Sequence, residues 1–247
     1  GALPSRAGRE ELKRKSWPPS PGGDTDRGWR LIFGRRAVNS KKESPKMALA
    51  FKRDFDIIEE HFRKGTVNKM KYMMLSDIHG DAECLQKALD RYEKEGAQTM
   101  LLLGDLLYHG PRNPIPAGYA AAQCAQLLNP YADRIIAVTG NCDAEVDQML
   151  LDFPIGAPYM ILPMEGYRIV MTHGHRPLEE LHLQAGDLLL HGHTHILKAE
   201  KENGYYVANP GSVSLPKGGN PRSYAVLEDR MLTIKNLDGE PIRELRF

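Results

Sequence analysis

The fold class of this chain is decided by residues 72–80, YMMLSDIHG, where an apolar run ends directly in polar side chains and a glycine. The apolar part, within residues 71–75, predicts a buried strand. Asp81 can cap a following helix that ends at Gly96, and residues 99–103 form the next apolar run. A strand, a helix and a strand in this order predict a parallel sheet with crossover connections.

The same alternation continues as far as Pro154 and then gives way to short strands with tight turns. Asn203-Gly204 and Asp238-Gly239 each predict a β-hairpin between two apolar runs. Besides the helix that Asp81 caps, we expect helices at 120–128 and 144–151, and about ten strands at 71–75, 99–103, 134–138, 159–163, 167–171, 187–190, 197–201, 205–208, 231–235 and 242–247. This order predicts an α/β fold of two facing mixed β-sheets flanked by helices, rather than an open doubly wound sheet.

The composition fits one soluble domain plus an extension. The chain has 247 residues, of which 41% are hydrophobic and 26% charged, and this excludes a fully disordered or collagen-like chain. No apolar run approaches the roughly 18 to 20 residues of a membrane-spanning helix, so we expect no membrane association. Three cysteines are too few for a disulfide-stapled secreted fold, and we therefore expect a reducing compartment, by default the cytoplasm.

Charge divides the chain into two parts. Residues 1–71 carry 18 Lys and Arg against 9 Asp and Glu, a net +9, whereas residues 72–247 carry 15 against 23, a net −8. We expect residues 1–70 to be a basic, largely disordered extension, with a short amphipathic helix within 51–64, and residues 71–247 to be the folded domain. The extension has no apolar stretch typical of a secretory signal. It could bind nucleic acid, but it lacks interleaved aromatic side chains, so we expect a solvated tail without a nucleic-acid partner.

Five clusters of residues that can bind metal ions each follow an apolar run. They are Ser76-Asp77-Ile78-His79-Gly80, Gly104-Asp105, Gly140-Asn141-Cys142-Asp143, Thr172-His173-Gly174-His175 and His191-Gly192-His193-Thr194-His195. In sheets of this kind ligands gather beyond the carboxyl ends of the strands, so the five loops can converge on one point. The glycine in each cluster permits the tight backbone that lets side chains close around an ion.

The side chains of these clusters suit a pair of divalent ions. Carboxylate, amide and imidazole ligands together favour a borderline ion such as Mn, Fe, Zn, Ni or Co. The set is larger than one ion needs, and Asp105 could bridge two ions. Two ions roughly 3.5 to 4 Å apart hold the attacking and leaving oxygens of a phosphoryl transfer. Although each cluster alone could be a cap, a turn or buried histidines, together they predict phosphoester hydrolysis.

In this order the motifs D-x-H, G-D, G-N-x-D, T-H-G-H and G-H-T-H resemble those of the calcineurin-like metallophosphoesterase superfamily, over essentially all of residues 71–247. Residues 104–113, 140–149 and 209–221 are similar to the small bacterial YfcE-like phosphodiesterases in particular. This resemblance implies a two-sheet sandwich flanked by helices. It also implies a metal-dependent phosphodiesterase, in which a hydroxide activated by two ions attacks phosphorus in line with the leaving oxygen.

The resemblance further implies a ligand set. One ion would be held by Asp77, His79, Asp105 and His195, and the second by Asp105, Asn141, His173 and His193. Of these, we expect catalysis to depend most on Asp105, Asn141 and His173. The expected cofactor is a pair of divalent ions, Mn²⁺ before Zn²⁺, Fe²⁺, Ni²⁺ or Co²⁺. The expected partner is a small phosphodiester substrate.

One position departs from the wider superfamily, in which many members have a histidine after the asparagine of the G-N-H-[DE] motif, a candidate general acid. This chain has Cys142 there. Bound cations would lower the pKa of the thiol, and a thiolate donates protons poorly, so His109 and His175 are alternative acids. Cys142 could also only fill space. Arg112 and Asn113 could contact the part of the substrate that is not hydrolysed, or order their own loop.

Two other functions stay open. The same centre could serve a phosphomonoesterase or nucleotidase, and a related fold serves as a protein-interaction scaffold in membrane-trafficking complexes whose catalytic set has decayed. Every ligand position is filled in this chain, which favours an enzyme. The sequence identifies neither the physiological diester nor the native metal, and it is compatible with a homo-oligomer.

Overall fold

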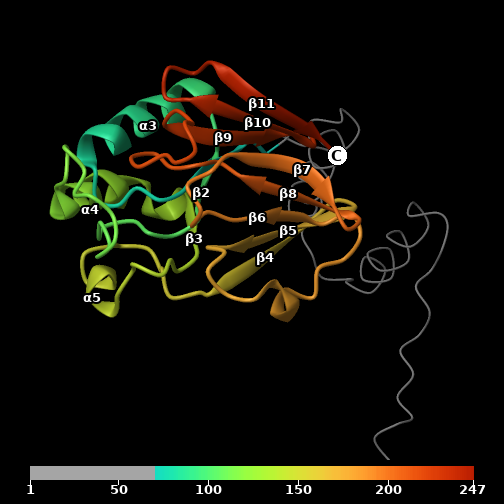
Figure 1. Ribbon diagram of the computed structural model, residues 1–247, viewed down its shortest axis with the longest axis horizontal. Helices are drawn as coiled ribbons and strands as arrows, with labels where there is room; N and C mark the ends of the chain where they lie inside the picture. Colours follow the sequence, from blue (N-terminus) through green and yellow to red (C-terminus); the bar gives the residue numbers. More distant parts are fainter. Residues whose placement is uncertain (1–69) are drawn as a thin grey trace, which may run out of the picture. The chain divides into compact units, whose positions relative to one another are not determined.

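Two β-sheets face each other across a shared apolar layer in the computed structural model of the chain (Figure 1). The structure describes residues 70–247. The extension expected at 1–70 lies outside the described residues except for Met70, and so does the helix expected within 51–64. Within 70–247, no helix has both the length and the apolar character needed to cross a lipid bilayer.

The first sheet has six strands in the order β11-β10-β9-β1-β2-β3. Their bounds are β1 Tyr72–Leu75, β2 Thr99–Leu102, β3 Ile135–Ala137, β9 Ser223–Glu228, β10 Met231–Asn236 and β11 Pro241–Arg246. Strands β1, β2 and β3 are parallel, whereas β9, β10 and β11 form an antiparallel half that joins the parallel half through the β1–β9 pair. The carboxyl ends of the three parallel strands therefore lie side by side at the same end of the sheet.

The second sheet has five strands in the order β4-β5-β6-β8-β7. Their bounds are β4 Tyr159–Met164, β5 Tyr167–Thr172, β6 Leu188–Leu190, β7 Lys198–Glu202 and β8 Tyr205–Asn209. Strands β5, β6 and β8 are parallel, and β4 and β7 pair with them antiparallel at the two edges. Each sheet thus contributes three parallel strands.

The longest helix, α3, spans Ala82–Glu95, as the sequence predicts. The side chain of Asp81 caps its first turn by accepting from the main-chain N–H of Cys84 at 3.0 Å, and Gly96 ends it with a φ of 64°. The other helical elements are α4 Ala121–Leu128, the 3-10 helices η3 Asn129–Arg134 and η4 Leu178–Leu181, and α5 Glu145–Gln148. The last is a single turn, shorter than the helix expected at 144–151.

Side chains along β1 point alternately to the two faces of the sheet, and this shows how the layers are built. Met73 and Leu75 belong to a buried cluster with side chains of α3 and α4, which cover one face of the six-stranded sheet (Figure 1). Tyr72 and Met74 point the other way, into the cluster between the two sheets. A buried side chain of this size contributes about 1.5 to 3 kcal/mol. A smaller cluster, which includes Leu181 of η4, lies with Val170, Leu189 and Val207 of the second sheet.

The predicted fold class is confirmed, with one strand missed. The structure has eleven strands in residues 70–247, and β9 is the one that the ten expected strands do not include. It is buried over five of its six residues and lies in the middle of its sheet. The continuous apolar run from Tyr224 to Leu227, between Pro221 and Asp229, is the signal that could have found it, because a strand buried on both faces does not alternate.

Candidate metal centre

Five of the six parallel strands lead directly into the residues that the sequence predicts as ligands. Asp77 and His79 follow β1, Asp105 follows β2, and Asn141 follows β3 of the six-stranded sheet. His173 and the pair His193 and His195 follow β5 and β6 of the other sheet. The two sheets therefore bring their ligand loops together at the carboxyl ends of their parallel strands.

The backbone of these loops is unusual. Five of the predicted ligands have a positive φ, between 51° and 67°: Asp77, His79, Asp105, His193 and His195. An L-residue with a side chain pays roughly 1 kcal/mol or more for this left-handed conformation, and such residues gather at functional sites. The loops hold their side chains in directions that an ordinary turn would not give.

Two glycines let the loops approach each other. A Cβ atom at Gly192 would lie 1.8 Å from Ser76 Oγ and 2.7 Å from Asp77 Oδ2, and a Cβ atom at Gly140 would lie 2.1 Å from Asp105 Oδ1. Any other residue at either position would push two loops apart. The glycines predicted to permit a tight backbone therefore act here by leaving room for a neighbouring carboxylate.

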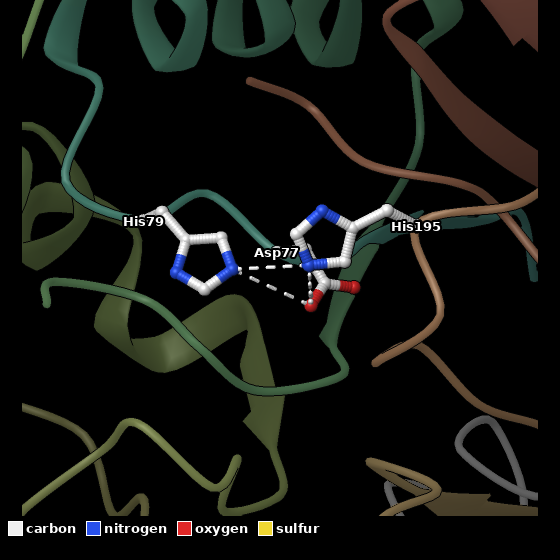
Figure 2. Close-up of side chains that lie close together, drawn as sticks. All are labelled: Asp77, His79 and His195. Atoms are coloured by element: carbon white, nitrogen blue, oxygen red, sulfur yellow. Dashed lines mark hydrogen bonds and ion pairs between the residues drawn. The ribbon is translucent and has the colours of Figure 1, made fainter. Parts of the chain in front are cut away.

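Asp77, His79 and His195 form the first ligand group (Figure 2). The two Nε2 atoms lie 3.2 Å apart, and Asp77 Oδ1 lies 3.2 Å from that of His195 and 3.7 Å from that of His79. All three residues are at most 2% exposed. Figure 2 shows both rings turning a nitrogen toward the carboxylate.

The protonation of these rings follows from their outer contacts. His79 Nδ1 lies 2.9 Å from the carbonyl oxygen of Tyr108, and His195 Nδ1 lies 2.6 Å from that of Leu215. A carbonyl oxygen can only accept, so each Nδ1 carries a proton, and Nε2 of the neutral form of each ring then presents a lone pair. Asp77 Oδ1 is buried and accepts no hydrogen bond from any residue within 70–247. Three electron-rich atoms thus converge without a donor, an arrangement that fits a bound cation.

Asp105 lies between the two halves of the site. Its Oδ2 is 3.6 Å from His79 Nε2 and 3.3 Å from His173 Nε2. His173 Nε2 is also 3.1 Å from Asn141 Oδ1, and His173 Nδ1 donates to the carbonyl oxygen of Leu103 at 2.7 Å. His173 is therefore oriented as His79 and His195 are, with Nε2 toward oxygen ligands.

His193 is the predicted ligand with the least direct contact to the others. Its ring centroid lies 5.1 Å from that of His173, in an edge arrangement, and its main-chain N–H donates to Asp77 Oδ2 at 3.0 Å. His193 is half-buried and Asn141 is exposed, whereas His173 and Asp105 are buried. The site opens to solvent beside His193 and Asn141.

A family model described as the calcineurin-like phosphoesterase superfamily domain matches residues 70–230. The chain belongs to this superfamily. Within it, the phosphodiesterase YfcE of Escherichia coli K12 is 47% identical over 175 residues, which are 70% of this chain and 95% of YfcE. A solved structure of the E. coli phosphoesterase YfcE matches with a TM-score of 0.68 at 46% identity, over 71% of this chain and 98% of that one. YsnB of Bacillus subtilis 168 is 30% identical over 190 residues, 72% of this chain and 97% of YsnB. The predicted resemblance is confirmed.

Acidic and basic groups at the centre of this calcineurin-like phosphoesterase shift one another's pKa. Burial lowers the pKa of His173, but the hydrogen bond to Asp105 and the charges of Asp77 and Asp105 outweigh it and raise the pKa to about 9. Burial likewise opposes ionisation of Asp105, yet the hydrogen bond from His173 holds the pKa of that carboxyl well below its usual range. A proton at His173 thus supplies positive charge where the carboxylates gather.

Asp143 supports the centre in a way that the sequence did not reveal. Its Oδ2 accepts from the main-chain N–H groups of Asp105 and Gly140, at 2.9 and 2.7 Å, and its Oδ1 accepts from that of Leu106 at 2.7 Å. Desolvation raises the pKa of Asp143. The residue fixes the left-handed loop at Asp105. Its place in the superfamily motif G-N-x-D was visible, but the three N–H groups that it binds were not.

Cys142 lies beside the ligands. Its Sγ, together with ligand atoms of His79 and Asp105, forms a group whose atoms all lie within 4.8 Å of one another, and Asn141 Nδ2 donates to it at 3.3 Å. Burial and then the Asp105 carboxylate raise the pKa of Cys142 to about 12. These two causes favour the thiol, whereas bound cations would favour the thiolate.

The other predicted substrate contacts divide into two groups. His175 is near the centre, with its ring centroid 5.5 Å from that of His173. His109 instead packs edge-on against Tyr119 at 5.3 Å, and its carbonyl oxygen accepts from Asn113 Nδ2 at 3.0 Å. Of the two roles considered for Asn113, the structure shows the ordering of its loop. Arg112 is exposed.

Proposed function

We propose that this calcineurin-like phosphoesterase is a metal-dependent phosphodiesterase, which hydrolyses a small phosphodiester at a centre of two divalent ions. The observation that carries the proposal is the buried, unpartnered Oδ1 of Asp77, which faces the Nε2 lone pairs of His79 and His195. A cation satisfies all three atoms at once. The 47% identity to the phosphodiesterase YfcE of E. coli supports the choice of a diester as substrate.

We assign the ligands of the two ions as follows. Asp77, His79, Asp105 and His195 would hold one ion, and Asp105, Asn141, His173 and His193 would hold the other. The position of Asp105 Oδ2 between the Nε2 atoms of His79 and His173 supports its role as the shared ligand. Oxygen and imidazole donors in these proportions suit Mn²⁺ as well as Fe²⁺ or Zn²⁺, and we propose Mn²⁺.

Two bound ions would supply a hydroxide nucleophile near neutral pH and would neutralise charge on the phosphoryl oxygens. The residues of the chain prepare the place for this chemistry. Main-chain carbonyls accept from Nδ1 of His79, His173 and His195, so that each ring is fixed with Nε2 toward the place of the ions. The exposed Asn141 and half-buried His193 line the side through which a substrate enters.

Protonation of the leaving group sets the expected preference among diesters. Cys142 stands where many relatives carry a histidine, and neither His109 nor His175 makes a hydrogen bond through its buried Nδ1 to any described residue. Without an acid positioned by the fold, substrates whose leaving oxygen needs no proton should react fastest. We therefore propose a preference for aryl and other good leaving groups over alkoxides.

The function is tested by stripping the full chain of metal with a chelator and reconstituting it with Mn²⁺, Zn²⁺ or Mg²⁺. A chromogenic diester and the monoester with the same leaving group are then compared. We expect turnover of the diester only with metal, and none in Asp105→Asn or His173→Ala. The exposed His182 provides a control, since His182→Ala should keep full turnover. Faster hydrolysis of the monoester would instead make the enzyme a phosphomonoesterase.

We also propose that the protein works in the cytoplasm and that residues 71–247 are sufficient for hydrolysis. All three cysteines, Cys84, Cys124 and Cys142, are free thiols, and the first two are buried, as suits a reducing compartment. The matched part of the chain covers 95% of YfcE, which supports a catalytic domain without the basic extension.

A further inference from the structure

A sixth strand end, that of β8, reaches the centre without supplying a predicted ligand. Residues 209–214, here called the support segment, begin with the last residue of β8 and read Asn-Pro-Gly-Ser-Val-Ser. Asn209 and Ser212 are 0% exposed and Ser214 is 2% exposed. Buried polar side chains must find partners, and those of the support segment find them in the ligand loops.

Both serines of the support segment bind the same atom. Ser212 Oγ donates to the main-chain carbonyl oxygen of Asp77 at 2.7 Å, and Ser214 Oγ donates to it at 3.1 Å. Ser212 Oγ also accepts from the main-chain N–H groups of Ser214 and Leu215, so its own proton is committed to Asp77. Asp77 has a φ of 54°. Two donors thus fix the peptide of a residue whose backbone would otherwise relax.

Asn209 reaches the loop of the other sheet. Its Nδ2 donates to the carbonyl oxygen of Gly192 at 2.8 Å and to Thr194 Oγ1 at 3.0 Å, while its Oδ1 accepts from the N–H of Gly211 at 2.8 Å. Gly192 and Thr194 flank His193, whose φ is 67°. The next residue after the segment, Leu215, offers the carbonyl oxygen that orients His195.

The contacts of the two serines fall on one side of the centre. Both bind the carbonyl oxygen of Asp77, and among residues 70–247 none of their side-chain hydrogen bonds reaches Asn141 or His173, whose loops are held by Asp143 and Leu103. The serines therefore act on the half of the site shown in Figure 2. Asn209 also supports the loop that carries His193, a ligand assigned to the second ion.

We infer that Ser212 and Ser214 are positioning residues that set the affinity of one ion, the one assigned to Asp77, His79, Asp105 and His195. This inference rests on the proposed function. The two serines hold Asp77 in its left-handed conformation, so that its carboxylate faces the His195 ring before an ion binds. Partners of metal ligands typically change affinity by about 10-fold to 100-fold when they are removed. The loops that carry Asn141 and His173, two ligands of the second ion, are held by Asp143 and Leu103 and should be unaffected.

The test is a Mn²⁺ titration of the metal-stripped full chain by calorimetry or chelator competition. In the Ser212→Ala/Ser214→Ala variant we expect one of the two sites to weaken by at least about tenfold and the other to stay within about twofold. Asn209→Asp loses the donations to Gly192 and Thr194 but keeps an acceptor for Gly211, and it should weaken both sites, because the loop that it supports carries one ligand of each ion, His193 and His195. If the double variant does not fold, Ser214→Ala alone should show the same selective loss in smaller measure.

A matched control separates positioning from general stability. Tyr224→Phe removes another hydroxyl, which lies in β9 and donates to Glu95 at 2.7 Å, at the last residue of α3 and outside the ligand loops. It should lower the Tm of the metal-free protein while leaving both Mn²⁺ affinities within about twofold. The site that weakens is identified by adding a ligand substitution to the double variant. His79→Ala should weaken further only the site that the double variant has already weakened, whereas Asn141→Ala should weaken the other site as well.

Two outcomes would overturn the inference. One is an unchanged pair of Mn²⁺ affinities in Ser212→Ala/Ser214→Ala, and the other is an equal loss at both sites in that variant. Failure of the proposed function looks different, because a wild-type chain that binds two ions but hydrolyses no diester would contradict the activity and leave the positioning role standing.

Discussion

The Nε2 atoms of His79 and His195 lie 3.2 Å apart, although each ring already donates its Nδ1 proton to a main-chain carbonyl. Two lone pairs therefore face each other, and the buried Oδ1 of Asp77 faces both. Such an arrangement is unfavourable in the metal-free protein and favourable once a cation enters. Removing the charge of Asp77 should therefore stabilise the metal-free protein and destabilise the metal-bound protein.

Asp77→Asn should stabilise the metal-free protein. Asp77 Oδ2 accepts from Ser76 Oγ and from the N–H of His193, so an asparagine keeps its oxygen there and places its amide at the Oδ1 position. That amide can donate to His195 Nε2, and the free energy of unfolding should rise by about 1 kcal/mol. The affinity for Mn²⁺ should fall by at least about tenfold. Urea unfolding in a chelator and a Mn²⁺ titration measure the two effects.

The control for that variant is Asp81→Asn. Asp81 is equally buried, but it caps α3, and asparagine caps a helix as well as aspartate does. Its stability should be unchanged with and without Mn²⁺. A metal-free Asp77→Asn protein that is less stable than the wild type would show that the Asp77 carboxylate is satisfied without an ion.

Asp143→Asn should impair both stability and turnover. The carboxylate of Asp143 accepts hydrogen bonds from the main-chain N–H groups of Asp105, Gly140 and Leu106. In an asparagine, the side-chain NH₂ group would face one of these donors and could not accept from it. A buried donor without an acceptor costs about 1 to 3 kcal/mol. Because the loop of Asp105 loses its support, kcat on a diester should fall as well. Asp133→Asn, at an exposed site, should change neither quantity, and normal turnover in Asp143→Asn would refute the supporting role.

Glu95 should give the protein a pH-dependent part of its stability. Burial would raise the pKa of Glu95, but hydrogen bonds from Lys235 at 2.8 and 2.9 Å and from Tyr224 at 2.7 Å outweigh it and lower the pKa. A lowered pKa stabilises the fold above the unfolded pKa of about 4.3, and this contribution is lost as the pH falls through the folded value.

Glu95→Gln should therefore lower the free energy of unfolding by about 1 kcal/mol at pH 7 and by progressively less below about pH 4. Urea midpoints between pH 3 and 8, measured in a chelator so that metal binding does not contribute, check this dependence. The exposed Glu180 is the control residue, since Glu180→Gln should show no such pH dependence. A constant difference between Glu95→Gln and wild type at every pH would contradict the ionic origin.

Deletion of residues 1–69 should leave hydrolysis intact. The folded residues carry the whole predicted ligand set and a net charge of −8 over 72–247, so the basic extension has no assigned part in the chemistry. We expect kcat and KM on a chromogenic diester within about twofold of the full chain. A large rise in KM that disappears at high salt would instead show that the extension helps to bind the anionic substrate.

The sequence was sufficient to predict the elements whose signals are local. The cap at Asp81, the left-handed end at Gly96 and the turn at Asn203-Gly204 each depend on neighbouring residues, and the structure has them where expected. The convergence of ligand loops was predictable too, because parallel strands end at one edge of their sheet.

Other features depended on residues far apart in the chain. Ser212 meets the carbonyl oxygen of Asp77 across 135 positions, and Asp143 meets the N–H of Asp105 across 38. The periodicity of apolar residues does not indicate such contacts, so the supporting side chains could not be assigned from the sequence. The strand β9 is a different case, because the apolar run from Tyr224 to Leu227 that indicates it is local and could have been recognised in the sequence.

The central claim is that two divalent ions share Asp105, and anomalous diffraction from a crystal of the full chain grown with Mn²⁺ tests it most directly. Data collected at the manganese edge should show two peaks, about 3.5 to 4 Å apart, on either side of Asp105 Oδ2. One peak should contact Asp77, His79 and His195, and the other Asn141, His173 and His193. No peak at this place, or a single ion that leaves Asp105 untouched, would contradict the account.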